Sequence, residues 1–361
     1  MTPPDTLDRL HAGLERLTRR RAPMPAPQVL VRTPDWDFTF GEHDRPFHSA
    51  SISKVLAATL VTMLVERGDL DFDTPLGALL PASDTDPLPA APGVDIASEV
   101  TVDHLLSHTS GLPDYFVTSR GHDTACSART LTTDPDRLWT VPEILASTRN
   151  LPPVGRPGER FCYSDTGYTL LGRITEEITG TRFETALREH VFDRCGMSTT
   201  STPHGDATVP ADLAQLDIVP MWIRGHELSR ALCLSAGRAD GGIVTIPADL
   251  MRFQEALHTG QLITRDHLDR MRRPRNRFRR GIHYGAGMAT IKFGEFAPPF
   301  LRGVAEPAGG IGLSATHMFY YPQQRAHVIL NFHSTRAMSQ SFRFHITLAR
   351  LISRPAMSVG G

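Results

Sequence analysis

The chain lacks most of the features that would place it in several common protein classes. Its 361 residues include only four cysteines, without a C-x-x-C pair or a spacing typical of a metal site. No apolar run is long enough to cross a bilayer, and no apolar core of a secretory signal precedes a cleavage site. We therefore expect a cytoplasmic protein with free thiols, although a mature form whose leader has been removed stays open.

An excess of charge of either sign is also missing. The chain has 38 Lys and Arg residues against 39 Asp and Glu residues, so its formal net charge is −1. This balance gives no bulk attraction to nucleic acid, and we expect neither a nucleic-acid nor a membrane partner. The composition, 40% hydrophobic and 21% charged, is enough for one large core or two modest ones.

One short motif carries chemistry. Ser51-Ile52-Ser53-Lys54 stands directly before the apolar run 55–65. On a helix, positions i and i+3 share a face, so Lys54 can approach the hydroxyl of Ser51. A serine hydroxyl needs such a neighbour to become a nucleophile, and S-x-x-K is one recurring solution in acyl-transfer enzymes. The alternative is a serine that merely caps a helix, since a four-residue pattern arises often by chance.

The order of the predicted elements indicates the fold class. Residues 28–33 and 36–41 form a predicted hairpin, and residues 284–293, 314–321 and 326–333 are predicted strands. Predicted helices lie at 101–110, 141–149, 166–179, 183–194 and 337–353. Strands at both ends and helices in the middle predict an α+β fold, with one sheet built from both termini and a helical region inserted.

Several longer runs carry a resemblance to a known family. Beside the Ser51 motif, they are residues 104–113, 157–172, 235–237, 240–245 and 284–287. With these runs in this order, the chain resembles the serine β-lactamase and penicillin-binding-protein superfamily, in its class C β-lactamase-like branch of esterases, D-aminopeptidases and acyltransferases. The resemblance implies an antiparallel sheet flanked by helices plus a helical domain. We expect an α/β domain from 1–75 and 236–361, a helical domain over 76–235, and an active site between them.

The resemblance also implies a role for Tyr163, which stands where the family has the tyrosine of its second motif. There it would be the general base for Ser51 and then the acid toward the leaving group; an ordinary half-buried tyrosine is the alternative. Asp165 departs from the family, which usually has asparagine. A carboxylate near Lys54 would favour the ammonium form. Lys54 would then orient Ser51 and hold Tyr163 partly deprotonated, unless Asp165 instead points away and caps a helix.

The third motif departs further. Where the family has K-T-G or H-x-G, this chain has Pro307-Ala308-Gly309-Gly310. The basic or hydroxyl side chains that meet a substrate carboxylate in drug-binding relatives are missing. The N–H of Gly310 can still complete an oxyanion hole with that of Ser51, and glycine suits a place where substrate lies close to the backbone. We thus expect Asp165, Gly309 and Gly310 to form the substrate-binding side of the site, with recognition of a penicillin-like carboxylate in doubt.

The function predicted from these residues is a serine hydrolase or acyltransferase that acts on a small ester or amide through an acyl-enzyme on Ser51, without metal or organic cofactor. Two alternatives stay open: a catalytically impaired binding or sensor protein, and a true β-lactamase or D,D-peptidase. A basic run before residue 284 has two interpretations, a solvated loop or a dock for an anionic acyl donor or carrier protein. Its members are Arg270, Arg272, Arg273, Arg275, Arg277, Arg279 and Arg280.

Overall fold

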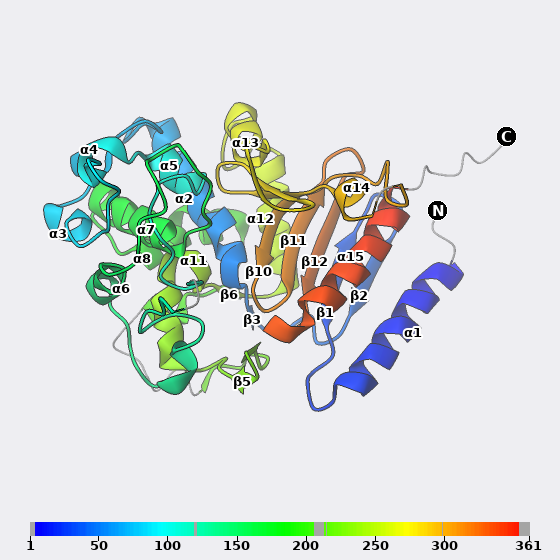
Figure 1. Ribbon diagram of the computed structural model, residues 1–361. Helices are drawn as coiled ribbons and strands as arrows, with labels where there is room; N and C mark the ends of the chain where they lie inside the picture. Colours follow the sequence, from blue (N-terminus) through cyan, green and yellow to red (C-terminus); the bar gives the residue numbers. More distant parts are fainter. Residues whose placement is uncertain (1–3, 119–120, 206–212, 214, 298, 354–361) are drawn as a thin grey trace.

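A computed structural model describes residues 4–118, 121–205, 213, 215–297 and 299–353, and it contains one large antiparallel sheet (Figure 1). The sheet draws strands from both ends of the chain, which confirms the predicted α+β fold class. In sheet order, the eight strands are β2 (Asp37–Phe40), β1 (Gln28–Arg32), β12 (Ala326–Asn331), β11 (Thr316–Tyr321), β10 (Ala308–Gly312), β9 (Ala289–Ile291), β8 (Ile282–Tyr284) and β7 (Asn276–Arg279).

The outer face of the sheet is covered by the two terminal helices, α1 (Pro4–Arg21) and α15 (Met338–Ile352) (Figure 1). Side chains alternate between the faces of a strand, so every second residue meets these helices. Val328 and Leu330 of β12 join the core cluster that contains Leu14 and Leu348. This agrees with the amphipathic pattern of both terminal segments.

The inner face meets α2 (Ser53–Arg67) and α12 (Pro247–His258). Ile329 of β12 belongs to the core cluster shared with these helices. Every residue of α2 from Ser53 to Leu64 is buried, because the helix lies between the sheet and the helical region. It ends at Arg67, and Gly68 follows as its left-handed C-cap. Neither α2 nor any other helix in the described part of the chain is long and apolar enough to cross a membrane.

The inserted helical region packs on the far side of α2 (Figure 1). Its helices are α3 (Ala82–Thr85), α4 (Ile96–Glu99), α5 (Val102–Leu106), α6 (Val141–Ser147), α7 (Asp165–Thr179), α8 (Phe183–Leu187), α9 (Asp193–Cys195) and α11 (Arg238–Gly241). One core cluster joins α2, α5 and α7. The proposed division at residues 75/76 and 235/236 stays a prediction.

Several short elements connect the larger ones. They are β3 (Phe47–His48) paired with β6 (Val244–Thr245), β4 (Trp222–Ile223) paired with β5 (His226–Glu227), the 3₁₀ turn η1 (Ala50–Ile52), and the helices α13 (Arg265–Arg272) and α14 (Phe293–Phe296). Because η1 runs directly into α2, it places Ser51 at the start of the buried helix.

Several elements differ from the sequence prediction, among them the following three. The single strand expected over 284–293 is a hairpin of β8 and β9, because Gly287 turns the chain with φ of +106°. The helix expected over 101–110 ends at Leu106. The strand β10 was not predicted, since its glycine-rich sequence has low strand propensity.

Candidate active site

Ser51 lies on a strained turn that neighbouring strands hold in place. The preceding residue, Ala50, has φ of +48°, a left-handed conformation that costs energy for a residue with a Cβ. The N–H of Ser49 donates to Ile243 O (2.9 Å), and the Thr316 hydroxyl donates to Ser49 O (3.1 Å). These bonds fix the turn from both sides, and the side chain of Ser51 stays partly exposed.

Lys54 is buried directly behind Ser51. Its Nζ donates to Ser51 Oγ (3.3 Å) and to the backbone oxygen of Asp240 (2.9 Å), and it forms an ion pair with Asp165. Burial acts to lower the pKa of Lys54, but the charges of Asp165 and Asp240 outweigh it and the pKa is raised. The resting amine is therefore an ammonium, as expected from a carboxylate at position 165.

Tyr163 lies beside Lys54, on the loop before α7. The Lys54 Nζ lies 5.1 Å from its ring centroid, and the ring of His108 stacks on it at 4.4 Å between centroids. Burial raises the pKa of Tyr163 well above its usual value, against a smaller hydrogen-bonding effect of Ser51. The expectation that Lys54 holds this phenol partly deprotonated is therefore wrong: burial disfavours the phenolate more than the nearby charge favours it.

Asp165 is available for Lys54 because another residue caps α7. The Ser164 hydroxyl accepts from the N–H of Gly167 (3.2 Å), which is the capping bond of the helix. The alternative in which Asp165 points away as a cap is therefore wrong. His108 fixes this corner as well: its Nδ1 accepts from the N–H of Ser164 (3.1 Å), and burial lowers its pKa to about 3, so the ring is neutral.

Sequence reasoning missed a second carboxylate beside Lys54. Asp240 Oδ2 accepts from the hydroxyl of Tyr115 (2.7 Å), which also points to Ala236 O (2.7 Å). Burial, with the charge of Asp165, raises the pKa of Asp240 to about 7. Asp240 lies in one of the runs quoted for the family resemblance, but no spacing rule shows that it faces a lysine 186 residues away.

A third buried carboxylate, Asp114, completes the group. Its Oδ1 accepts from the N–H groups of Phe116 (3.0 Å) and Asp165 (3.2 Å). Burial and then the charge of Asp165 raise its pKa well above the usual value. Lys54 thus pairs with the carboxylate of Asp165 and acts by its charge on two further buried carboxyls, Asp114 and Asp240, whose pKa values are raised. We call these four residues the Lys54 cluster.

The two glycines expected on the substrate side lie in β10, which passes close to the Ser51 turn. A Cβ on Gly310 would come within 3.3 Å of Ile52 Cα, and a Cβ on Gly309 would collide with Met318 O at 1.8 Å. Gly309 therefore requires glycine for its packing on β11, and Gly310 fits tightly against the Ser51 turn. Among the described residues, no group of His, Cys, Asp and Glu could hold a metal ion.

Four arginines of the basic run form ion pairs within the chain. Arg270 and Arg275 both donate to Asp103 (2.8 Å each), while Arg272 pairs with Asp269 (2.6 Å). Arg277 reaches Glu295 at 3.7 Å. Part of the run is therefore used in intramolecular ion pairs, which weakens its interpretation as a single anion dock.

Comparison with known proteins adds three findings. A family model described as Beta-lactamase matches residues 33–352. Penicillin-binding protein 4 of Amycolatopsis lactamdurans is 34% identical over 159 residues, which cover 44% of this chain and 36% of the relative. Esterase EstB of Burkholderia gladioli is 30% identical over 161 residues, which cover 43% and 38%. The match thus spans little more than a third of each curated relative's length.

A solved structure shares the fold over almost the whole chain. The D-amino acid amidase from Ochrobactrum anthropi SV3, in its complex with D-phenylalanine, superposes with a TM-score of 0.75 at 21% identity. The match covers 97% of this chain and 100% of the amidase chain. At this identity, the likeness concerns the fold.

Proposed function

Because the chain belongs to the Beta-lactamase family, we propose that it is a serine hydrolase or acyltransferase that acts on an ester or amide through an acyl-enzyme on Ser51. The resemblance predicted from the motifs is confirmed by the family match. One observation carries the proposal: Lys54 Nζ, held by Asp165, donates to the hydroxyl of a partly exposed serine at the start of a buried helix.

In the proposed first step, Ser51 Oγ attacks the carbonyl carbon of the substrate. The neutral phenol of Tyr163 accepts the Ser51 proton while it gives its own proton to the leaving group, so the step needs no resident phenolate. The Lys54 ammonium stabilises the negative charge that develops on the two oxygens. Water or another acceptor then attacks the acyl-enzyme. Tyr163 accepts the proton of this acceptor while it returns its own proton to Ser51 Oγ, and the acyl group is released.

The oxyanion of this step is proposed to bind between the backbone N–H groups of Ser51 and Gly310. The close packing of β10 on the Ser51 turn supports this arrangement. Preorganised N–H donors stabilise a tetrahedral intermediate because they need no reorganisation during the reaction, and loss of one donor typically costs about 3 kcal/mol in the transition state.

Several finer points remain part of this proposal. The four free thiols, two of them buried, fit the reducing cytoplasm. The substrate is proposed to be a small molecule, and the arginine run stays a candidate contact for an anionic acyl donor or carrier protein. A β-lactamase activity is not favoured, because the third motif supplies no side chain for a substrate carboxylate.

A fluorophosphonate probe tests the proposal directly. We expect stoichiometric labelling that mass spectrometry assigns to Ser51, and hydrolysis of a p-nitrophenyl ester that is lost in Ser51→Ala. Labelling at Ser49 or Ser53 instead, or an unchanged rate in Ser51→Ala, would overturn it. Nitrocefin serves as the parallel substrate: fast opening with a covalent penicillin adduct would favour the β-lactamase alternative. A folded protein with neither label nor turnover would favour the binding protein.

A further inference from the structure

A largely apolar pocket opens beside Ser51. It holds about 520 Å³ of empty space, part of it open to solvent, and Ser51 and Asp240 belong to its wall. Most of the wall comes from the helical region and from the segment around β4. The apolar side chains of the wall include Phe116, Leu131, Met221, Ile223, Leu234 and Leu313.

In the described part of the chain, no positive charge lines the pocket itself, and the Lys54 ammonium behind Ser51 is engaged in its ion pair with Asp165. Among the described residues that line it, none is a lysine or an arginine. Its one histidine, His48, is kept neutral because burial lowers its pKa, and its Nε2 bonds to Ser229 O (2.7 Å). The ionisable wall groups beside Ser51 are the carboxyls of Asp165 and Asp240. A ligand carboxylate placed here would lose its hydration and meet acids rather than a cation.

The position of the pocket distinguishes the two halves of a substrate. Tyr163, which is proposed to protonate the leaving group, does not line the pocket, although Ser51 does. The rings around Tyr163 belong to a separate aromatic group with Phe278 and Tyr284. The leaving group should therefore extend toward Tyr163, and the acyl group into the apolar pocket.

Resting on the proposed function, we propose that the substrates are esters or amides of an uncharged, apolar acyl group longer than acetyl, which the pocket beside Ser51 binds. Each methylene removed from water then contributes to kcat/KM, by about fourfold per group. An acyl chain that ends in a carboxylate is excluded.

The first test is a series of p-nitrophenyl esters from acetate to octanoate. We expect kcat/KM to rise about fourfold per methylene until the pocket is full, which is roughly 250-fold from acetate to hexanoate. A flat series that still depends on Ser51 would overturn the acyl pocket and leave the proposed function intact. If no turnover depends on Ser51, both the acyl pocket and the proposed function are overturned.

Two variants locate the effect. Leu313→Trp narrows the pocket from a half-buried position and should lower the ratio of kcat/KM for hexanoate to that for acetate at least tenfold. Met221→Ala deepens the pocket and should move the optimum to a longer chain. The matched control is Leu79→Trp, a half-buried leucine in another cluster, which should change neither ester. Equal losses for hexanoate and acetate in Leu313→Trp would overturn the assignment.

Binding without turnover gives an independent measurement. In the Ser51→Ala protein, hexanamide should bind at least tenfold more tightly than adipamate, which has the same length but ends in a carboxylate. Equal affinities would overturn the charge exclusion. Tighter binding of adipamate would point to a cation in the site and contradict the proposal as a whole.

Discussion

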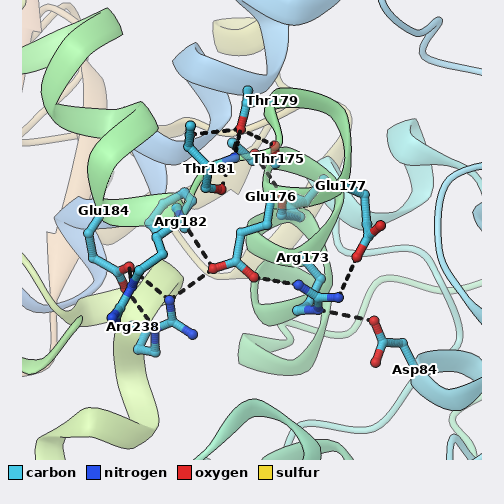
Figure 2. A network of polar contacts seen from close by, with 12 residues as sticks. Asp84, Arg173, Thr175, Glu176, Glu177, Thr179, Thr181, Arg182, Glu184 and Arg238 are labelled. Atoms are coloured by element: carbon cyan, nitrogen blue, oxygen red, sulfur yellow. Dashed lines mark hydrogen bonds and ion pairs between the residues drawn. The ribbon is translucent and has the colours of Figure 1, made fainter. Parts of the chain in front are cut away.

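Two clusters of charged side chains, one within the helical region and one where this region meets α2, behave in opposite ways. In the Arg173 cluster (Figure 2), Arg173 donates to Asp84 (3.1 Å), Glu176 (2.5 Å) and Glu177 (2.6 Å), and Arg238 also reaches Glu176 (3.0 Å). In the Lys54 cluster, one ammonium pairs with Asp165, while the carboxyls of Asp114 and Asp240 have no ion pair of their own in the described part of the chain.

The pKa values show what this difference means. In the Arg173 cluster, burial acts to raise the pKa of Glu176, but the two guanidinium groups outweigh it and the pKa is lowered. In the Lys54 cluster the pKa of Asp240 is raised to about 7, because burial and Asp165 outweigh Lys54. The first arrangement stabilises the ionised carboxylates. The second keeps carboxyl groups with raised pKa values beside Ser51, a pattern that favours a functional site.

Loss of the cation from the Lys54 cluster should have the largest effect on activity. Lys54→Met keeps a similar side-chain length but removes the donor to Ser51 and the charge that stabilises the reacting oxygens. We expect kcat/KM for a p-nitrophenyl ester to fall by about 10³-fold. Loss of one cation from the other cluster, in Arg173→Met, is the control and should leave kcat/KM of the folded protein within twofold. A tenfold or smaller loss in Lys54→Met would contradict the role given to this amine.

The same control variant makes its own prediction about stability. Arg173→Met leaves Asp84 and Glu176 partly buried with fewer partners, so we expect the free energy of unfolding to fall by about 2–3 kcal/mol. The side chain of Arg173 is 22% exposed, which places the loss below that of a fully buried pair. Denaturant titration measures it, with the exposed Arg188→Met of the same region as a reference that should change stability by less than about 0.5 kcal/mol. An equally small change in Arg173→Met would show that the network contributes little.

The sequence predicted one of these clusters only in part. Ser51 and Lys54 were found because their spacing on a helix brings them together. Tyr163 and Asp165 came from the family motifs. Asp240 begins one of the quoted runs and Asp114 directly follows another, but their convergence depends on how distant segments pack around α2, which local periodicity does not record.

The fold itself follows the periodicity more closely, with instructive exceptions. The hairpin of β1 and β2, the strands β11 and β12 and the helix α15 match their predicted ranges within a few residues. The strand β10 was missed because its residues are chosen for close packing on the Ser51 turn rather than for strand propensity. The conformation of β10, which packs on the Ser51 turn, therefore depends on tertiary contacts rather than on local propensity.

The two clusters also differ in how pH changes their contribution to stability, because the pKa of Asp240 is raised and that of Glu176 is lowered. The pKa of Asp240 is about 7 in the folded protein against an ordinary value of 3.8. Its contribution to stability is therefore complete below about pH 4 and is lost as pH rises to 7. Relative to the wild type, Asp240→Asn should gain on the order of 1–2 kcal/mol in unfolding free energy between pH 5 and pH 7.

Glu176→Gln is the control for this pH dependence. The pKa of Glu176 is lowered in the folded protein, so its contribution is present above the ordinary value of 4.5 and is lost as pH falls. Its stability difference from the wild type should stay nearly constant between pH 5 and 7. A constant difference for Asp240→Asn as well would show that Asp240 is ionised in the folded protein throughout this range.

Asp165→Asn restores the residue usual in the family and should change the pH profile rather than abolish activity. The charge of Asp165 raises the pKa values of Lys54, Tyr163 and Asp240 alike. The proposed mechanism requires Lys54 to keep its proton, and loss of the Asp165 charge should lower the pKa of this ammonium. We therefore expect the alkaline limb of kcat/KM to move down by about one pH unit, a tenfold loss at a pH on that limb. A limb that stays in place would mean that Asp165 exerts no net charge on Lys54, and a limb that moves up would contradict the role of the ammonium.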